Sequence, residues 1–175
     1  MTIEELANLI SKAAKVAFTE AHERYGEDQL IGYSIISHDT ADSCFPVVAT
    51  KNGCANYEYG SDSYFLFTQV EWDGSCDNSV FYKVNEEIGK LYDLGDYEQD
   101  PDWHNKFREF VFESNVRGLE LLIDEGFFGT EEERNKLFIA FSVSDSETSE
   151  THLPNWVKRL NTESVNAKYS SSSNV

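Results

Sequence analysis

Long apolar runs and paired cysteines are both missing from this sequence. No apolar stretch approaches the roughly 20 residues that a membrane-spanning helix needs, and the acidic N-terminal segment Met1–Glu5 is unlike a signal peptide. The three cysteines, Cys44, Cys54 and Cys76, form no CxxC pair, and no histidine stands at metal-ligand spacing from them. We therefore expect a cytoplasmic protein with reduced thiols, no bound metal and no contact with membranes.

Motifs that mark common enzyme classes are also missing. The sequence contains no GxGxxG, P-loop, HExxH or GxSxG pattern, so dinucleotide binding, nucleotide hydrolysis, zinc proteolysis and α/β-hydrolase chemistry lack their usual signatures. Nothing in the sequence pairs a cysteine with a histidine for nucleophilic catalysis. The four histidines lie on separate predicted elements: His22, His38, His104 and His152. We expect no cofactor, and the pattern favours a binding protein over an enzyme.

Positive charge is scarce. The chain of 175 residues has 14 lysines and arginines against 32 acidic residues, which gives a formal net charge of -18. Between Asn52 and Asp102 twelve acidic residues face only two basic ones, Lys83 and Lys90. Such a surface repels the phosphates of nucleic acids and anionic lipids, and it accelerates association with cationic proteins. High solubility is the alternative explanation for the charge.

The densest acidic stretch follows the second predicted helix, where side chains project freely from a helix end and a loop. We predict that a cationic protein partner binds this stretch. Its carboxylates are at Asp93, Asp96, Glu98, Asp100 and Asp102, with Glu86 and Glu87 as support. The spacing does not match the calcium loop of an EF-hand, so we predict no metal there.

Two carboxylates and an aromatic cluster leave other hypotheses open. Asp145 follows a predicted strand, a position that suits a carboxylate accepting backbone N–H bonds in a turn or a catalytic one. Glu71 precedes Trp72, and we expect a buried, hydrogen-bonded carboxylate there rather than a general base. We interpret the aromatic cluster as core, although such rings also stack on ligands. Its members are Tyr57, Tyr59, Tyr64, Phe65, Phe67 and Trp72. The alternatives to partner masking are a small enzyme or ligand-binding domain that uses Asp145, Glu71 and this cluster, and an adaptor.

The apolar stretch Leu137–Val143 predicts the central strand of the fold. It is apolar on both faces, which is typical of a strand inside a sheet. Residues 30–37 and 44–50 are separated by a short turn and predict an antiparallel hairpin. Residues 64–68 are a candidate third strand. We expect a mainly antiparallel sheet with Leu137–Val143 in its interior.

Helical periodicity and capping residues predict about four helices. They span residues 3–25, 80–92, 102–125 and 153–160. Thr2 and Glu5 form a capping-box pattern, and Gly26 and Gly126 suit helix ends. The fold class is therefore α+β, an α/β sandwich-like arrangement. We expect one globular domain over residues 1–161 and a flexible serine-rich tail over residues 162–175.

Five short patterns resemble an uncharacterised bacterial domain family, domain of unknown function 4303. They are Gly32–Ile36, Val70–Trp72, Gly126–Gly129, Ser142–Ser146 and Val157–Asn161. The resemblance extends from about Leu6 to Asn161. One departure is Thr162, which stands where the family pattern tends to continue with proline.

The resemblance implies an α/β cytoplasmic bacterial domain, and the family supplies no established catalytic residues to carry over. Domains of this size and acidity resemble, by analogy, the immunity proteins of bacterial toxin systems. A nuclease toxin is basic because it grips phosphates, and an acidic inhibitor can cover that surface. Our hypothesis is an immunity protein that neutralises a cationic toxin by masking its surface.

Overall fold

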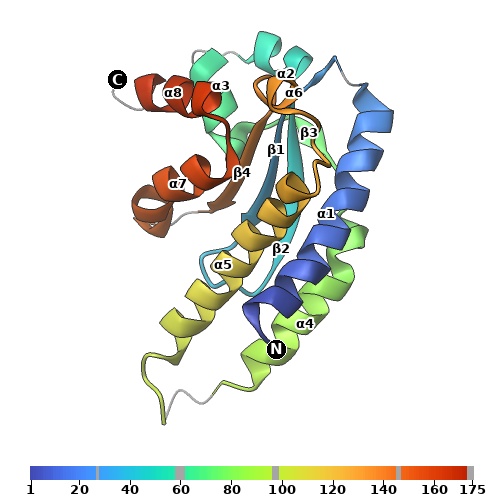
Figure 1. The fold of residues 1–175 in the computed structure, drawn as a ribbon. Helices are drawn as coiled ribbons and strands as arrows, with labels where there is room; N and C mark the ends of the chain where they lie inside the picture. The colour runs from blue at the N-terminus through green and yellow to red at the C-terminus, as the bar shows by residue number, and fades with distance from the viewer. Residues whose placement is uncertain (27, 58–61, 96–98, 145–146, 173–175) are drawn as a thin grey trace.

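A mixed four-stranded sheet lies at the centre of the computed structural model, which describes residues 1–26, 28–57, 62–95, 99–144 and 147–172 (Figure 1). The strands are β1 (Leu30–Ser37), β2 (Cys44–Thr50), β3 (Gly74–Ser75) and β4 (Phe138–Val143). Their order is β3-β2-β1-β4; β2 is antiparallel to β1 and β3, whereas β4 is parallel to β1. The α+β class is confirmed, with a sheet that is mixed.

Helices enclose this sheet. They are α1 (Ile3–Tyr25), α2 (Lys51–Asn56), α3 (Asp62–Phe67), α4 (Tyr82–Asp93), α5 (Trp103–Asp124), α6 (Glu131–Arg134), α7 (Glu147–Leu160) and α8 (Glu163–Ser172). Short 3-10 helices span Gln69–Glu71 and Asn78–Phe81. The described residues thus contain eight α-helices where we expected about four. The long helices α1, α4 and α5 match the predicted positions, and the additional helices include several short ones.

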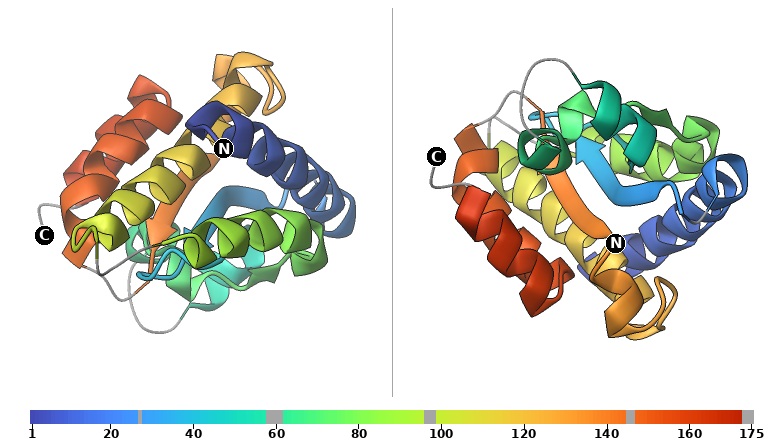
Figure 2. Two further views of the ribbon diagram at one scale, coloured as in Figure 1. Left: turned by 90° about the horizontal axis from the view of Figure 1, so that it is seen from below. Right: turned by 90° about the horizontal axis from the view of Figure 1, so that it is seen from above.

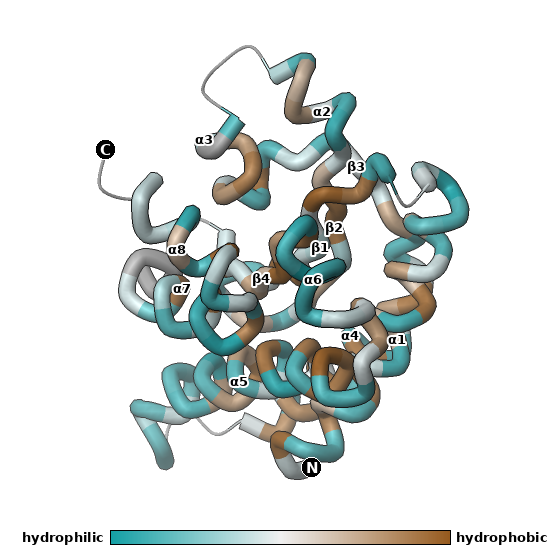
Figure 3. Tube along the Cα trace, turned by 45° about the horizontal axis from the view of Figure 1, so that its top comes forward, coloured by the Kyte–Doolittle hydropathy of each residue, from teal (hydrophilic) through white to brown (hydrophobic). Residues whose placement is uncertain are grey.

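Two apolar layers flank the sheet. Helices α1 and α5 cover one face, and residues of α3, α7 and α8 form a smaller cluster on the other (Figures 1 and 2). Figure 3 shows the most hydrophobic segments gathered along the strands. The two long helices approach closely because α1 presents alanines and α5 presents Gly118. A Cβ atom at Gly118 would lie only 2.8 Å from Cγ2 of Ile10. In the described ranges, no helix has both the length and the apolarity needed to cross a membrane.

The predicted ends of α1 are confirmed. The backbone N–H of Glu5 donates to Oγ1 of Thr2 at 3.2 Å, and the N–H of Thr2 donates to Oε2 of Glu5 at 2.6 Å. This capping box satisfies two backbone donors at the helix start. Gly26 follows the last turn with φ of +83°, a conformation that favours glycine.

Strand β4 lies at the end of the strand order, so the predicted interior position of Leu137–Val143 is wrong. All six residues of β4 are nevertheless buried, because helices cover both faces. Asn161 takes the place of a neighbouring strand. Its Oδ1 accepts from the N–H of Ile139 at 2.9 Å, and its Nδ2 donates to the carbonyl of Ile139 at 2.6 Å. Burial by helices gives an edge strand the apolar pattern of an interior one.

Residues 64–68, the candidate third strand, belong to α3 and the residue after it, and β3 at Gly74–Ser75 completes the sheet instead. Phe67 packs edge-on against Phe138, with ring centroids 5.0 Å apart. A short aromatic run does not distinguish a strand from a turn of buried helix. The sequence prediction was therefore wrong in the type of element. It was right in assigning Phe65 and Phe67 to the core, whereas Tyr64 is 50% exposed.

Residues 163–172 form the helix α8, whereas we expected a flexible tail from residue 162. Val165 is buried, and Tyr169 stacks on Phe138 with centroids 6.2 Å apart. The apolar residues at positions 165 and 169 are four apart, so they lie on one helical face against the sheet. The serine-rich composition of the segment concealed this spacing.

The three cysteines are free thiols, and Cys44 and Cys76 are buried. Burial raises the pKa of both buried thiols to about 12. Because the thiolate is the reactive form, we expect the partly exposed Cys54 to react first with a disulfide reagent at pH 8. Titration of the denatured chain should find all three thiols. Fewer than three, or stoichiometric zinc by elemental analysis, would contradict the prediction of reduced, metal-free cysteines.

Candidate functional site

The acidic residues of α4 lie on its exposed side. Helix α4 ends near the N-terminal end of α5, at one end of the molecule (bottom of Figure 1). Asp93 is exposed, and Lys90 lies between two other carboxylates, with Nζ 3.1 Å from Glu86 Oε1 and 2.8 Å from Glu87 Oε1. Lys90 is well exposed, and pairs of this kind contribute only about 0–1 kcal/mol. These carboxylates can therefore exchange Lys90 for the cations of a partner.

The acidic residues before α5 are also partly paired. Nζ of Lys106 lies 2.8 Å from Oδ2 of Asp100 and 4.0 Å from Oδ2 of Asp102. The hydrogen bond from Lys106 lowers the pKa of Asp100, so this carboxylate stays ionised in mildly acidic solution. Asp96 and Glu98 lie outside the described residues. The predicted acidic surface therefore carries less free charge than the sequence count indicates.

Two exposed apolar side chains accompany these carboxylates. Tyr82 at the start of α4 is 74% exposed, and Leu94 directly after α4 is 79% exposed. Tyr82, Glu86 and Asp93 are four and seven residues apart in turn, so they share one face of the helix. The sequence predicted Glu86 and Asp93 as partner-binding residues but did not indicate Tyr82 or Leu94 beside them. An aromatic residue displaced from the apolar stripe was the available signal. We use the name outer face of α4 for Tyr82, Glu86 and Asp93 together with Leu94, which lies just beyond the end of the helix.

The alternative site is not assembled by the described residues. Glu71 is exposed in a 3-10 turn, which contradicts the expected buried, hydrogen-bonded carboxylate. Asp145 lies outside the described residues, as does Tyr59 of the aromatic cluster. Trp72 packs against the sheet, where its indole Nε1 donates to the carbonyl of Phe65 at 3.0 Å. Among the described rings of this cluster, Phe67 and Trp72 pack against the sheet as part of the core.

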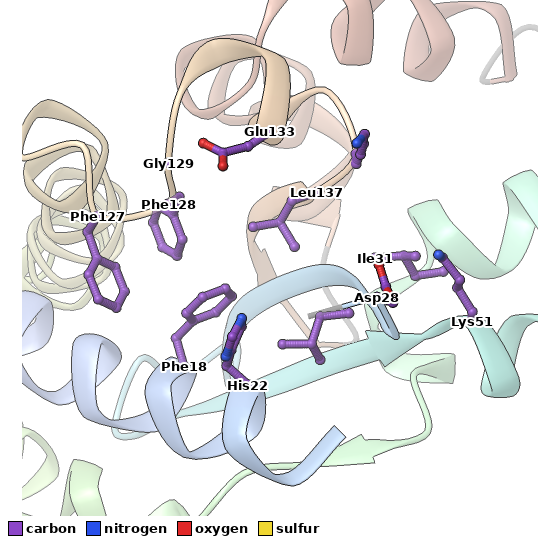
Figure 4. A pocket seen from close by; sticks show the side chains of 12 residues that line it. Phe18, His22, Asp28, Ile31, Lys51, Phe127, Phe128, Gly129, Glu133 and Leu137 are labelled. Carbon is purple, nitrogen blue, oxygen red and sulfur yellow. The ribbon is translucent and has the colours of Figure 1, made fainter. Parts of the chain in front are cut away.

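A pocket that sequence reasoning missed lies between α1, the start of β1, the turn after α5 and α6. Its volume is about 300 Å³. Figure 4 shows Phe18, Phe127 and Phe128 together on one side, with Asp28 and Lys51 on the opposite side. The lining comes from positions more than 100 residues apart in the sequence, so no local pattern indicates it. In the described ranges, no group of three or more histidine, cysteine or acidic side chains could hold a metal ion.

Residues 10–162 match the family described as domain of unknown function DUF4303. The chain belongs to this family. No curated protein matches the chain, and no solved structure matches it either.

The patterns that carry the family resemblance have structural roles here. Gly32 makes room for an indole, because a Cβ atom there would lie 2.7 Å from Cη2 of Trp72. Arg159 joins α7 to α5 through a bidentate ion pair with Glu113, at 2.7 and 2.8 Å, and a bond to Glu120 at 2.9 Å. These carboxylates raise the pKa of Arg159. Gly32 and Arg159, which belong to two of these patterns, therefore position Trp72 and α7 rather than a reactive group.

Proposed function

We propose that this protein is a cytoplasmic, acidic immunity-type protein that binds a toxin domain, such as a nuclease, and masks its cationic surface. The observation that supports the proposal most is the outer face of α4, where exposed apolar and acidic side chains occur together. Charged residues alone also serve solubility. The exposed apolar side chains of Tyr82 and Leu94 do not increase solubility. Protein interfaces typically bury apolar and aromatic side chains at the centre of a polar rim.

The two kinds of side chain would contribute differently to the complex. The carboxylates attract a basic partner over long range and raise the association rate. The apolar groups slow dissociation, since fully burying a side chain of this size contributes about 1.5–3 kcal/mol. A nuclease needs its basic surface to grip phosphates. Occupation of that surface by an acidic protein excludes the substrate without any chemical step.

The outer face can be tested with the partner that the proposal requires. Tagged protein purified from its source cell should retain one stoichiometric basic protein, and co-expression should protect cells from that protein. The double variant Tyr82→Ala/Leu94→Ala should weaken binding by more than tenfold, because truncated anchors commonly cost at least about 2 kcal/mol together. Calorimetric titration with the purified partner gives the affinity.

A matched control is Val70→Ala, which truncates a side chain that is 62% exposed on another part of the surface. It should bind the partner as the unaltered protein does. Tyr82, Leu94 and Val70 are all exposed, so the melting temperatures of both variants should stay close to that of the unaltered protein. The proposal is wrong if no basic partner is retained, or if the double variant binds as tightly as the control.

A further inference from the structure

The pocket between α1 and the turn after α5 has an aromatic wall. Phe18 meets Phe128 edge-on with ring centroids 5.0 Å apart, and it meets Phe127 edge-on at 5.6 Å. Leu30 and Leu137, each 8% exposed, extend the apolar lining. Rings arranged in this way present faces and edges on which a further ring can pack.

The turn that positions two of these rings requires glycine at both ends. After the end of α5, Gly126 has φ of +70° and Gly129 has φ of +86°. Residues other than glycine rarely adopt these conformations. Phe127 and Phe128 stand between them and point toward Phe18 (Figure 4). The turn therefore serves the pocket as well as ending the helix.

The polar part of the pocket carries two ammonium groups. Lys51 and Lys136 line it, and neither makes an ion pair among the described residues. Of the two lining carboxylates, Glu133 is held by Thr130, whose N–H and hydroxyl donate to its Oε2 at 2.7 and 2.8 Å; these bonds, with a smaller contribution from the charge of Lys136, lower the pKa of Glu133. Asp28 is the remaining one. Two lysines without an ion pair among the described residues thus line one pocket of a chain whose net charge is -18.

We propose that this pocket binds a small organic anion that carries an aromatic ring system. The ring packs against Phe18, Phe127 and Phe128, and the anionic group binds Lys51 and Lys136. A volume of about 300 Å³ lies at the lower end of the range for ligand pockets, which suits a ligand of one or two rings. The pocket lies at the opposite end of the sheet from the outer face of α4, so it does not depend on the proposed toxin interface.

Three probes with one ring system and different charges test this site. Indole-3-acetate is the anion, indole-3-acetamide is its neutral counterpart, and tryptamine is the cation. In NMR titrations of labelled protein, the acetate should shift the amides of Ile31, Lys51 and Phe128 in a saturable manner. It should bind about tenfold or more tightly than the amide, because hydrogen bonds to a charged group are stronger. Tryptamine should bind no better than the amide.

The variant Lys51→Gln/Lys136→Gln should reduce the affinity for indole-3-acetate to that for the amide. The control Lys12→Gln/Lys158→Gln removes two exposed lysines away from the pocket and should change nothing. All four side chains are exposed, so both variants should fold, which their amide spectra will show. The proposal is overturned if the acetate gives no saturable shifts in the pocket, if acetate and amide bind equally, if tryptamine binds most tightly, or if the pocket variant keeps its preference for the anion.

Discussion

Replacing Asn161 by alanine should reduce the free energy of unfolding by about 2–4 kcal/mol. The side chain bonds both backbone groups of Ile139 and also donates to the carbonyl of Val157 at 3.0 Å. Its loss leaves the N–H and carbonyl of a buried strand without partners, and each unsatisfied buried group costs about 1–3 kcal/mol. Urea unfolding followed by circular dichroism measures the change.

Two further variants separate this role from a general effect of mutation. Asn155 lies exposed on α7, and Asn155→Ala should change stability by no more than about 0.5 kcal/mol. Asn161→Asp keeps an acceptor for the N–H of Ile139 but places a carboxylate against its carbonyl, so it should destabilise the protein as well. An unchanged unfolding midpoint for Asn161→Ala would show that the edge of β4 does not depend on this side chain.

Replacing Phe141 by alanine should reduce the free energy of unfolding by about 3–5 kcal/mol. This ring is fully buried on β4, and its centroid lies 5.7 Å from that of Phe112 on α5 and 5.0 Å from that of Trp156 on α7. The truncation leaves a cavity where three elements meet. Chemical denaturation measures the loss, and the fluorescence of Trp156 reports on the site itself.

The conservative variant Phe141→Leu should cost much less, about 1.5 kcal/mol or below, because it largely preserves the buried volume. Phe45 on β2 is only partly buried, so Phe45→Ala should also cost less than Phe141→Ala. If Phe141→Ala were no worse than Phe45→Ala, the junction of β4, α5 and α7 would not be the centre of the core.

The parts of the fold that follow from local periodicity could be predicted from the sequence. The stripe of α1 and its capping box needed only residues close together in the chain, and the hairpin of β1 and β2 needed only a short turn. The position of β4 could not be predicted, because its edge is completed by Asn161, 22 residues after its partner Ile139. An edge strand whose two faces are covered by helices has the same apolar composition as a strand in the interior of a sheet, so the sequence does not distinguish the two positions.

The candidate site was predicted only in part for the same reason. The density of carboxylates before α5 is visible in the sequence, whereas their pairing with Lys90 and Lys106 depends on side-chain geometry. The exposure of Tyr82 follows from its position off the apolar stripe of α4, whereas Leu94 lies beyond the end of the helix, where the stripe predicts nothing. The pocket brings Phe18 against Phe128, with ring centroids 5.0 Å apart, and no spacing rule connects residues so far apart in the sequence.

The dependence of association rate on salt tests the proposed acidic interface most directly. The variant Asp93→Asn/Asp100→Asn/Asp102→Asn removes three described carboxylates from it, and Glu131→Gln/Glu132→Gln/Glu163→Gln removes three exposed ones elsewhere. Stopped-flow mixing with the purified partner, between about 0.05 M and about 0.5 M salt, gives the association rates. The Debye length, over which charges act on each other, falls to a few Å across this range.

The unaltered protein and the control variant should associate fast at low salt and slow steeply as salt rises, while dissociation changes little. The interface variant should associate more slowly at low salt, with a flatter dependence, and the rates should converge at high salt. An interface variant with the same rate and the same salt dependence as the unaltered protein would contradict the account, and the acidic residues would then serve solubility alone.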